Sequence, residues 1–73
     1  MKLKRLNEMK KSDVVFFNSK KYAYKDAVIE VEWNGRTYSY SSETHPEIRG
    51  TEMKTVSDVL YWVKDDYAEN YAQ

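Results

Sequence analysis

The chain has 73 residues, of which 41% are hydrophobic and 33% charged, and it contains no cysteine and a single histidine, His45. A chain of this length is expected to form one domain, over residues 1–73. The composition excludes disulfides and leaves too few soft ligands for a zinc site. A chain this short buries only about 60% of the surface that its unfolded form exposes. Seven Tyr, two Trp and two Phe must therefore supply much of the core, with dimerisation as the other aid.

The net charge is zero, but the charges are segregated along the chain. Residues 1–27 hold eight Lys/Arg and three acids (8 − 3 = +5), whereas residues 43–73 hold three Lys/Arg and seven acids (3 − 7 = −4). Such asymmetry indicates either an interaction surface or two ends that attract each other within the fold. No apolar stretch suggests a secretory signal or a membrane span, so we expect a cytoplasmic protein.

The first third predicts one helix and two strands. Leu3, Leu6 and Met9 recur every three residues among lysines and arginines, which predicts a short basic helix over residues 2–11, with a frayed arm as the alternative. The apolar run 14–17 predicts a strand. Residues 20–25 alternate around Tyr22 and Tyr24 and predict a second strand.

Asn34-Gly35 then predicts a two-residue hairpin between strands 28–33 and 36–41. With that turn, Trp33 would oppose Arg36 and form a cation–π pair, Val31 would oppose Tyr38, and Ile29 would oppose Tyr40. The hairpin has one apolar face and one nearly all polar face. We therefore expect the apolar face to cover a core and the polar face to meet solvent.

The last third predicts a connection followed by a helix. Pro46 and Gly50 suit the two ends of a single helical turn at 45–49. Thr55 to Asp58 fits a capping box, which opens a helix to about Tyr71. One apolar stripe follows this helix: Val56, Val59, Leu60, Val63, Tyr67 and Tyr71. The expected fold is α+β, a small antiparallel sheet of three to four strands covered on one face by the C-terminal helix, with a short basic N-terminal helix.

Catalysis finds no support in the sequence. His45 lies in a Thr-His-Pro-Glu turn with no evident partner base, and both glycines have a turn or cap role, which leaves no phosphate loop. Glu43, His45 and Glu47 match no established metal-ligand spacing. We therefore predict no enzyme activity, no catalytic residue, no metal and no cofactor.

The outer side of the C-terminal helix is the main candidate site. Six residues point away from the apolar stripe: Asp58, Tyr61, Trp62, Asp65, Asp66 and Glu69. Aromatic side chains flanked by charge are typical of interface hot spots, and carboxylates on a helix can replace phosphates in a nucleic-acid-binding cleft. This pattern predicts a surface that binds a protein, chiefly one that itself handles nucleic acid. The alternative is that Trp62 only packs against a neighbouring strand or the N-terminal helix.

Two other hypotheses remain open. Lys20, Lys21 and Lys25 interleave with aromatic residues, which is typical of single-strand nucleic-acid binders and suggests a small regulator that uses the basic third. The alternation, however, separates Tyr22 and Tyr24 from Lys21 and Lys25, and zero net charge disfavours general nucleic-acid binding. The third hypothesis is a homodimeric accessory protein whose exposed aromatics face each other.

Three segments carry a resemblance to a known class of proteins: the hairpin Asn34-Gly35-Arg36-Thr37-Tyr38-Ser39-Tyr40, the loop after it, and the helical segment Ser57-Asp58-Val59-Leu60-Tyr61-Trp62. Together they resemble small phage proteins that inhibit host DNA-acting enzymes. Examples are uracil-DNA glycosylase inhibitors and the anti-CRISPR proteins that block Cas nucleases. The likeness covers roughly residues 28–70 and is one of size, topology and charge. It implies an inhibitor that occupies a nucleic-acid site on its target, although the basic N-terminal third departs from a wholly acidic mimic.

Overall fold

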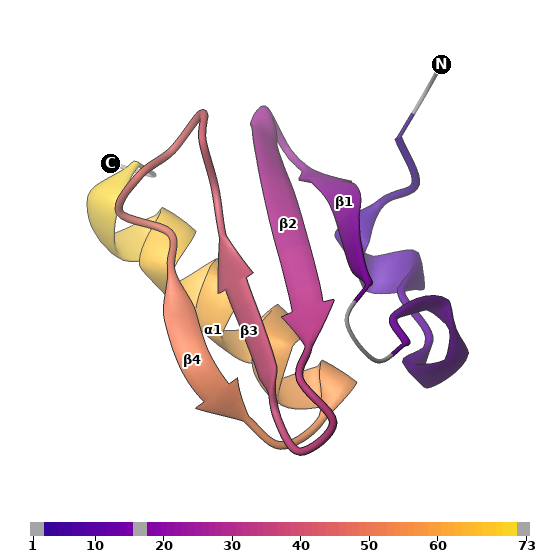
Figure 1. The fold of residues 1–73 in the computed structure, drawn as a ribbon. Helices are drawn as coiled ribbons and strands as arrows, with labels where there is room; N and C mark the ends of the chain where they lie inside the picture. Colours follow the sequence, from indigo (N-terminus) through magenta and orange to yellow (C-terminus); the bar gives the residue numbers. More distant parts are fainter. Residues whose placement is uncertain (1–2, 16–17, 72–73) are drawn as a thin grey trace.

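A four-stranded antiparallel sheet and one α-helix make up the fold (Figure 1). The computed structural model describes residues 3–15 and 18–71. The strands lie in the order β1-β2-β3-β4, which is also their order in the chain. Their bounds are β1 Ser19–Tyr24, β2 Ala27–Trp33, β3 Tyr38–Ser41 and β4 Gly50–Met53, and the helix α1 covers Val56–Asn70. The predicted α+β architecture is thereby confirmed.

The core lies between one face of the sheet and two covering elements. Helix α1 packs against β3 and β4, while the N-terminal segment lies beside β1 (Figure 1). Val59 and Val63 of α1 are fully buried, and the other members of the predicted apolar stripe pack against the same core. The remaining buried apolar residues are Leu6, Met9, Val14, Tyr22, Ala27, Ile29, Val31, Tyr38, Tyr40 and Ile48.

The central hairpin forms with a different register from the predicted one. Trp33 pairs with Tyr38 and Val31 with Tyr40, so residues 34–37 make a four-residue loop. The Asn34 side chain closes this loop by accepting hydrogen bonds from the backbone N–H groups of Arg36 (2.9 Å) and Thr37 (2.8 Å). The register moves by two residues, an even number, and the predicted faces are therefore retained. Trp33 packs against Tyr38, with ring centroids 4.5 Å apart, in place of the predicted Arg36 contact.

The predicted N-terminal helix is replaced by two short 3-10 turns, Leu6–Glu8 and Lys11–Asp13. The residues before them are extended because the Lys4 carbonyl accepts a hydrogen bond from the backbone of Ala23 in β1 (2.9 Å). The predicted strand at 14–17 is absent at Val14 and Val15, and residues 16–17 lie outside the described part. The strand predicted at 20–25 is confirmed as β1, except that Lys25 belongs to the following turn.

The predicted helical turn at 45–49 is instead a hydrogen-bonded turn, in which the Ile48 backbone N–H donates to the His45 carbonyl (2.9 Å). Ile48 is fully buried and anchors the β3–β4 connection to the core. Gly50 does not cap a helix but begins β4, opposite Tyr40. A side chain at this position would collide with the Tyr40 ring, because a Cβ atom built on Gly50 lies 2.7 Å from Tyr40 Cε1.

A β-bulge interrupts the pairing of β3 with β4. Tyr38 pairs with Met53 and Tyr40 with Gly50, so two residues of β4 face one of β3. Glu52 absorbs the extra residue by adopting φ 62°, a left-handed conformation that costs an ordinary L-residue about 1–2 kcal/mol. The exposed Glu52 is thus held in a strained backbone conformation by the sheet around it.

Replacing Glu52 with glycine is expected to stabilise the protein. Glycine relieves the left-handed strain but loses about 0.5–1 kcal/mol through its greater freedom in the unfolded chain. A net gain of about 0.5–1 kcal/mol remains, and urea denaturation measures it. Thr51→Gly is the matched control, since this β4 neighbour has no positive φ and should lose stability. If Glu52→Gly lowered the free energy of unfolding as much as Thr51→Gly does, the backbone at Glu52 would not be strained.

Candidate binding surface

Helix α1 presents an aromatic pair to solvent. Thr55 fixes the start of the helix, because its Oγ1 accepts a hydrogen bond from the backbone N–H of Asp58 (3.1 Å). With Val59 and Val63 turned into the core, Tyr61 and Trp62 face outward and are 62% and 42% exposed. Their rings pack edge to face with centroids 5.2 Å apart. Trp62 is thus only partly covered by its own fold, and a large apolar surface remains available to a partner.

Carboxylates surround this aromatic pair. Asp65 and Glu69 are exposed and Asp58 is half-buried, as the predicted helix face requires. Four acids and one lysine between residues 56 and 70 give α1 a charge of 1 − 4 = −3. We call Asp58, Tyr61, Trp62, Asp65 and Glu69 the acidic helix face.

Asp66, which the sequence placed on this same face, has a structural role instead. Its carboxylate accepts a hydrogen bond of 2.6 Å from the hydroxyl of Tyr40, a residue only 4% exposed. Burial, together with the bond to Asp66, raises the pKa of the Tyr40 hydroxyl far above its ordinary value. Asp66 thus ties α1 to β3. Among the described residues, it is the hydrogen-bond partner of the buried Tyr40 hydroxyl.

The lysines of the alternative nucleic-acid site do not form a platform. Lys20 and Lys21 are adjacent in β1 and so point to opposite faces of the sheet. Lys25 lies in the β1–β2 turn, with its Nζ 5.2 Å from the centre of the Tyr67 ring. Tyr22 is fully buried and has no surface on which a base could stack.

The basic side chains on the N-terminal segment and on β1 are nevertheless exposed to solvent. The N-terminal segment and β1 carry exposed Lys4, Arg5, Lys10, Lys11, Lys20 and Lys21, which we call the basic edge. Within residues 3–15 and 18–71 the lysine–carboxylate ion pair is Lys4–Asp13 (3.3 Å), and His45 Nε2 lies 3.5 Å from an Asp26 oxygen. Neither joins the basic edge to a carboxylate of residues 43–73, so direct ion pairs do not account for the segregated charge.

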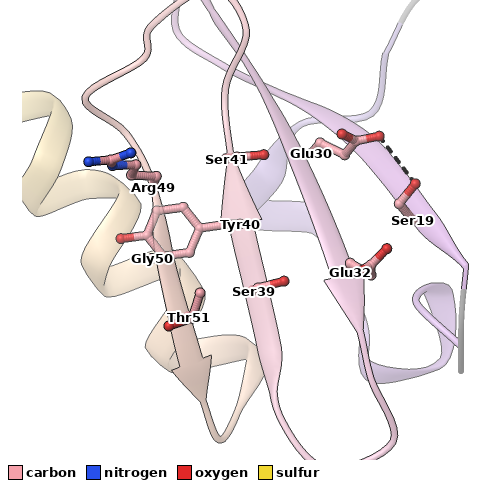
Figure 2. Close-up of a pocket in the computed structure, with 9 residues that line it drawn as sticks. All are labelled: Ser19, Glu30, Glu32, Ser39, Tyr40, Ser41, Arg49, Gly50 and Thr51. Carbon is pink, nitrogen blue, oxygen red and sulfur yellow. Dashed lines mark hydrogen bonds between the residues drawn. The ribbon is translucent and has the colours of Figure 1, made fainter.

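The uncovered face of the sheet is polar and shallowly hollowed (Figure 2). Glu30 and Glu32 of β2 point into the hollow, and Ser39 and Ser41 of β3 lie beside them. The Ser19 hydroxyl donates a hydrogen bond to Glu30 (3.1 Å). This arrangement confirms the predicted solvent face of the hairpin.

A histidine–tyrosine cluster, which the sequence did not reveal, joins three elements. His45 of the β3–β4 loop packs against Tyr67 and Tyr71 at the end of α1, with ring centroids 5.8 and 4.5 Å apart. Its Nε2 lies 3.5 Å from Asp26 in the β1–β2 turn, and its Nδ1 lies 2.9 Å from the Thr44 hydroxyl. The expectation that His45 lacks a partner base is therefore wrong: Asp26, 19 residues earlier in the chain, lies beside it.

The tyrosines of this cluster bind carboxylates. The Tyr67 hydroxyl donates to Asp26 (2.6 Å) and the Tyr71 hydroxyl donates to Glu47. These bonds lower the pKa of both carboxyls and contribute to the raised pKa of both hydroxyls. Only the spacing of Tyr67 and Tyr71, one helical turn apart, hinted at a shared contact. The cluster thereby fastens the end of α1 to the β1–β2 turn and to the β3–β4 loop.

Acid should weaken this attachment. A carboxyl whose folded pKa is lowered stabilises the fold above its ordinary pKa, here 3.8 for Asp26 and 4.5 for Glu47, and loses that stabilisation as the pH falls through the folded pKa. The double variant Tyr67→Phe/Tyr71→Phe should therefore lose less stability than the wild type when the pH falls from roughly 6 to roughly 3. Chemical denaturation at each pH measures this slope. Exposed Tyr61→Phe is the control, and identical slopes in all three proteins would refute the role of the bonds.

Comparisons with protein-family models, with curated proteins and with solved structures find no match. In the described part of the chain, no helix has the length and apolar character needed to cross a membrane, and no three His, Asp or Glu side chains gather as a metal site requires.

Proposed function

We propose that this protein is a small binding module whose acidic helix face docks on a basic surface of a partner protein. The observation that carries the proposal is the exposed Tyr61–Trp62 pair set among Asp58, Asp65 and Glu69. Trp62 is 42% exposed, whereas Val59 and Val63, which anchor the same helix to the core, are fully buried. The Trp62 side chain can fill a pocket on a partner, where aromatic residues supply most of the binding energy.

The partner that fits this chemistry is a protein with a nucleic-acid-binding cleft. Carboxylates spaced along a helix meet lysines and arginines that ordinarily hold phosphates, and Trp62 can stack on an arginine at the same time. The resemblance to small phage inhibitors of DNA-acting enzymes agrees with this assignment. The proposed function is thus inhibition of a host nucleic-acid-acting protein by occupation of its cleft.

A pull-down from nuclease-treated bacterial lysate tests this function. The bait is the wild-type chain, beside a helix variant, Asp65→Lys/Glu69→Lys, and a control, Glu32→Lys, which reverses an exposed acid on the uncovered sheet face. We expect a discrete protein that the wild type and the control retain, that the helix variant loses, and that added duplex DNA displaces. Capture that disappears with nuclease treatment would place the function on the basic edge instead. Capture by the helix variant equal to that of the wild type would refute the proposal.

A further inference from the structure

Two surfaces of opposite charge lie on different sides of the molecule. The basic edge belongs to the N-terminal segment and β1, whereas the acidic helix face belongs to α1, which packs on β3 and β4 at the other end of the sheet (Figure 1). Residues 3–25 carry seven Lys/Arg and two acids (7 − 2 = +5), against −3 for α1. Strand order thus converts the charge segregation of the sequence into a separation in space.

The two surfaces do not neutralise each other inside the fold, although Lys4 of the basic edge pairs with Asp13 beside it (3.3 Å). The described residues contain no ion pair between the basic edge and α1, and β2 and β3 stand between β1 and β4 in the sheet. Net charge is zero and the isoelectric point is near 6.6, so two copies do not repel each other at neutral pH. The nearest complement to the acidic helix face of one molecule is therefore the basic edge of another.

We infer that the protein associates head to tail, the acidic helix face of one copy binding the basic edge of a second. Opposite potentials orient the two molecules, and lysines or arginines of the second copy stack on Tyr61 and Trp62. The contact is heterologous, since each copy uses two different surfaces, and a chain of copies can therefore grow. This differs from a twofold dimer in which the aromatics face each other.

The inference rests on the acidic helix face being a binding surface, as in the proposed function, and it adds a regulation of that surface. A second copy covers the face that the partner protein needs, so association and partner binding exclude each other. Protein concentration and salt then set how much of the face is free, because interactions between exposed charges weaken as ionic strength rises.

Sedimentation velocity on the purified 73-residue chain tests the inference without any partner. Wild-type protein should sediment at a weight-average mass of at least roughly twice the monomer at low salt, about 20 mM, and as a monomer near 500 mM, where exposed charges are screened. The helix variant Asp65→Lys/Glu69→Lys and an edge variant, Arg5→Glu/Lys11→Glu, should each be monomeric at both salt concentrations. Glu32→Lys is the control and should associate like the wild type.

Mixing the two variants decides the geometry. The helix variant retains a basic edge and the edge variant retains an acidic helix face, so an equimolar mixture should form a heterodimer that grows no further. A heterodimer also shows that both variants are folded. Wild-type protein that is monomeric at low salt, variants that still associate alone, or a mixture that stays monomeric would each overturn the inference. None of these results affects capture of a partner protein, so the proposed function stands or falls separately.

Discussion

Replacing Gly50 with alanine should lower the free energy of unfolding by about 1–3 kcal/mol, the usual cost of forcing an extra methyl group into a packed site. The new Cβ would lie 2.7 Å from Cε1 and 2.8 Å from Cζ of Tyr40. The ring cannot move away cheaply, because its hydroxyl is bonded to Asp66 on α1. Denaturant titration followed by circular dichroism measures the loss.

A loss of stability in Gly50→Ala, and not a gain, would identify the contact with the Tyr40 ring as its cause. Alanine in a strand is ordinarily more stable than glycine by up to about 0.5–1 kcal/mol, because glycine loses more backbone freedom on folding. Gly50 has no positive φ that would favour glycine. A loss of stability must therefore come from the Tyr40 ring, and exposed Thr51→Ala on the same strand should change stability much less. A Gly50→Ala protein as stable as the wild type would show that the ring does not lie over the strand in this way.

Two adjacent aspartates should separate stability from binding. Asp66→Ala removes the acceptor of the Tyr40 hydroxyl and should cost about 1.5–3 kcal/mol, the usual range for a hydrogen bond to a charged group. Asp65→Ala removes an exposed carboxylate and should alter stability by less than about 0.5 kcal/mol. For partner binding we expect the reverse: among folded proteins, Asp65→Ala should weaken binding more than Asp66→Ala.

A double-mutant cycle checks the reason for the Asp66 effect. Removal of both bonding partners leaves no unsatisfied polar group, so Tyr40→Phe/Asp66→Ala should cost clearly less than the sum of the two single changes. Additive losses would mean that the 2.6 Å contact contributes nothing specific. Equal losses for Asp65→Ala and Asp66→Ala would contradict the assignment of Asp66 to the fold.

Local patterns predicted the parts of the fold that local chemistry determines. The apolar stripe and Thr55 cap located α1 to within a residue or two, and the alternation about Asn34-Gly35 assigned the faces of β2 and β3. The hairpin register was missed because Asn34 uses its side chain to bind the N–H groups of Arg36 and Thr37 and so favours a longer loop. The basic segment 2–11 was misassigned because pairing of Lys4 with Ala23 in β1 competes with the helix that the spacing favours.

The candidate site was predicted in part for the same reason. Helical periodicity places Tyr61, Trp62, Asp65 and Glu69 on the outer side of α1, and the structure finds their side chains exposed. The same periodicity could not show that Asp66 bonds Tyr40, because that contact spans 26 residues and depends on how α1 crosses β3. Nor could it bring His45 to Asp26 and the two tyrosines, which belong to three different elements.

The most direct test of the acidic helix face is the affinity of the captured partner for Trp62→Ala, measured by calorimetry at a salt concentration that keeps the protein monomeric. Truncation of a central aromatic anchor should cost at least about 2 kcal/mol of binding free energy, or roughly 30-fold in Kd. Val15→Ala is the matched control, since Val15 is 52% exposed in a different part of the chain. A Trp62→Ala affinity within about twofold of both wild type and control would contradict the account, because a hot-spot residue cannot be removed at so small a cost.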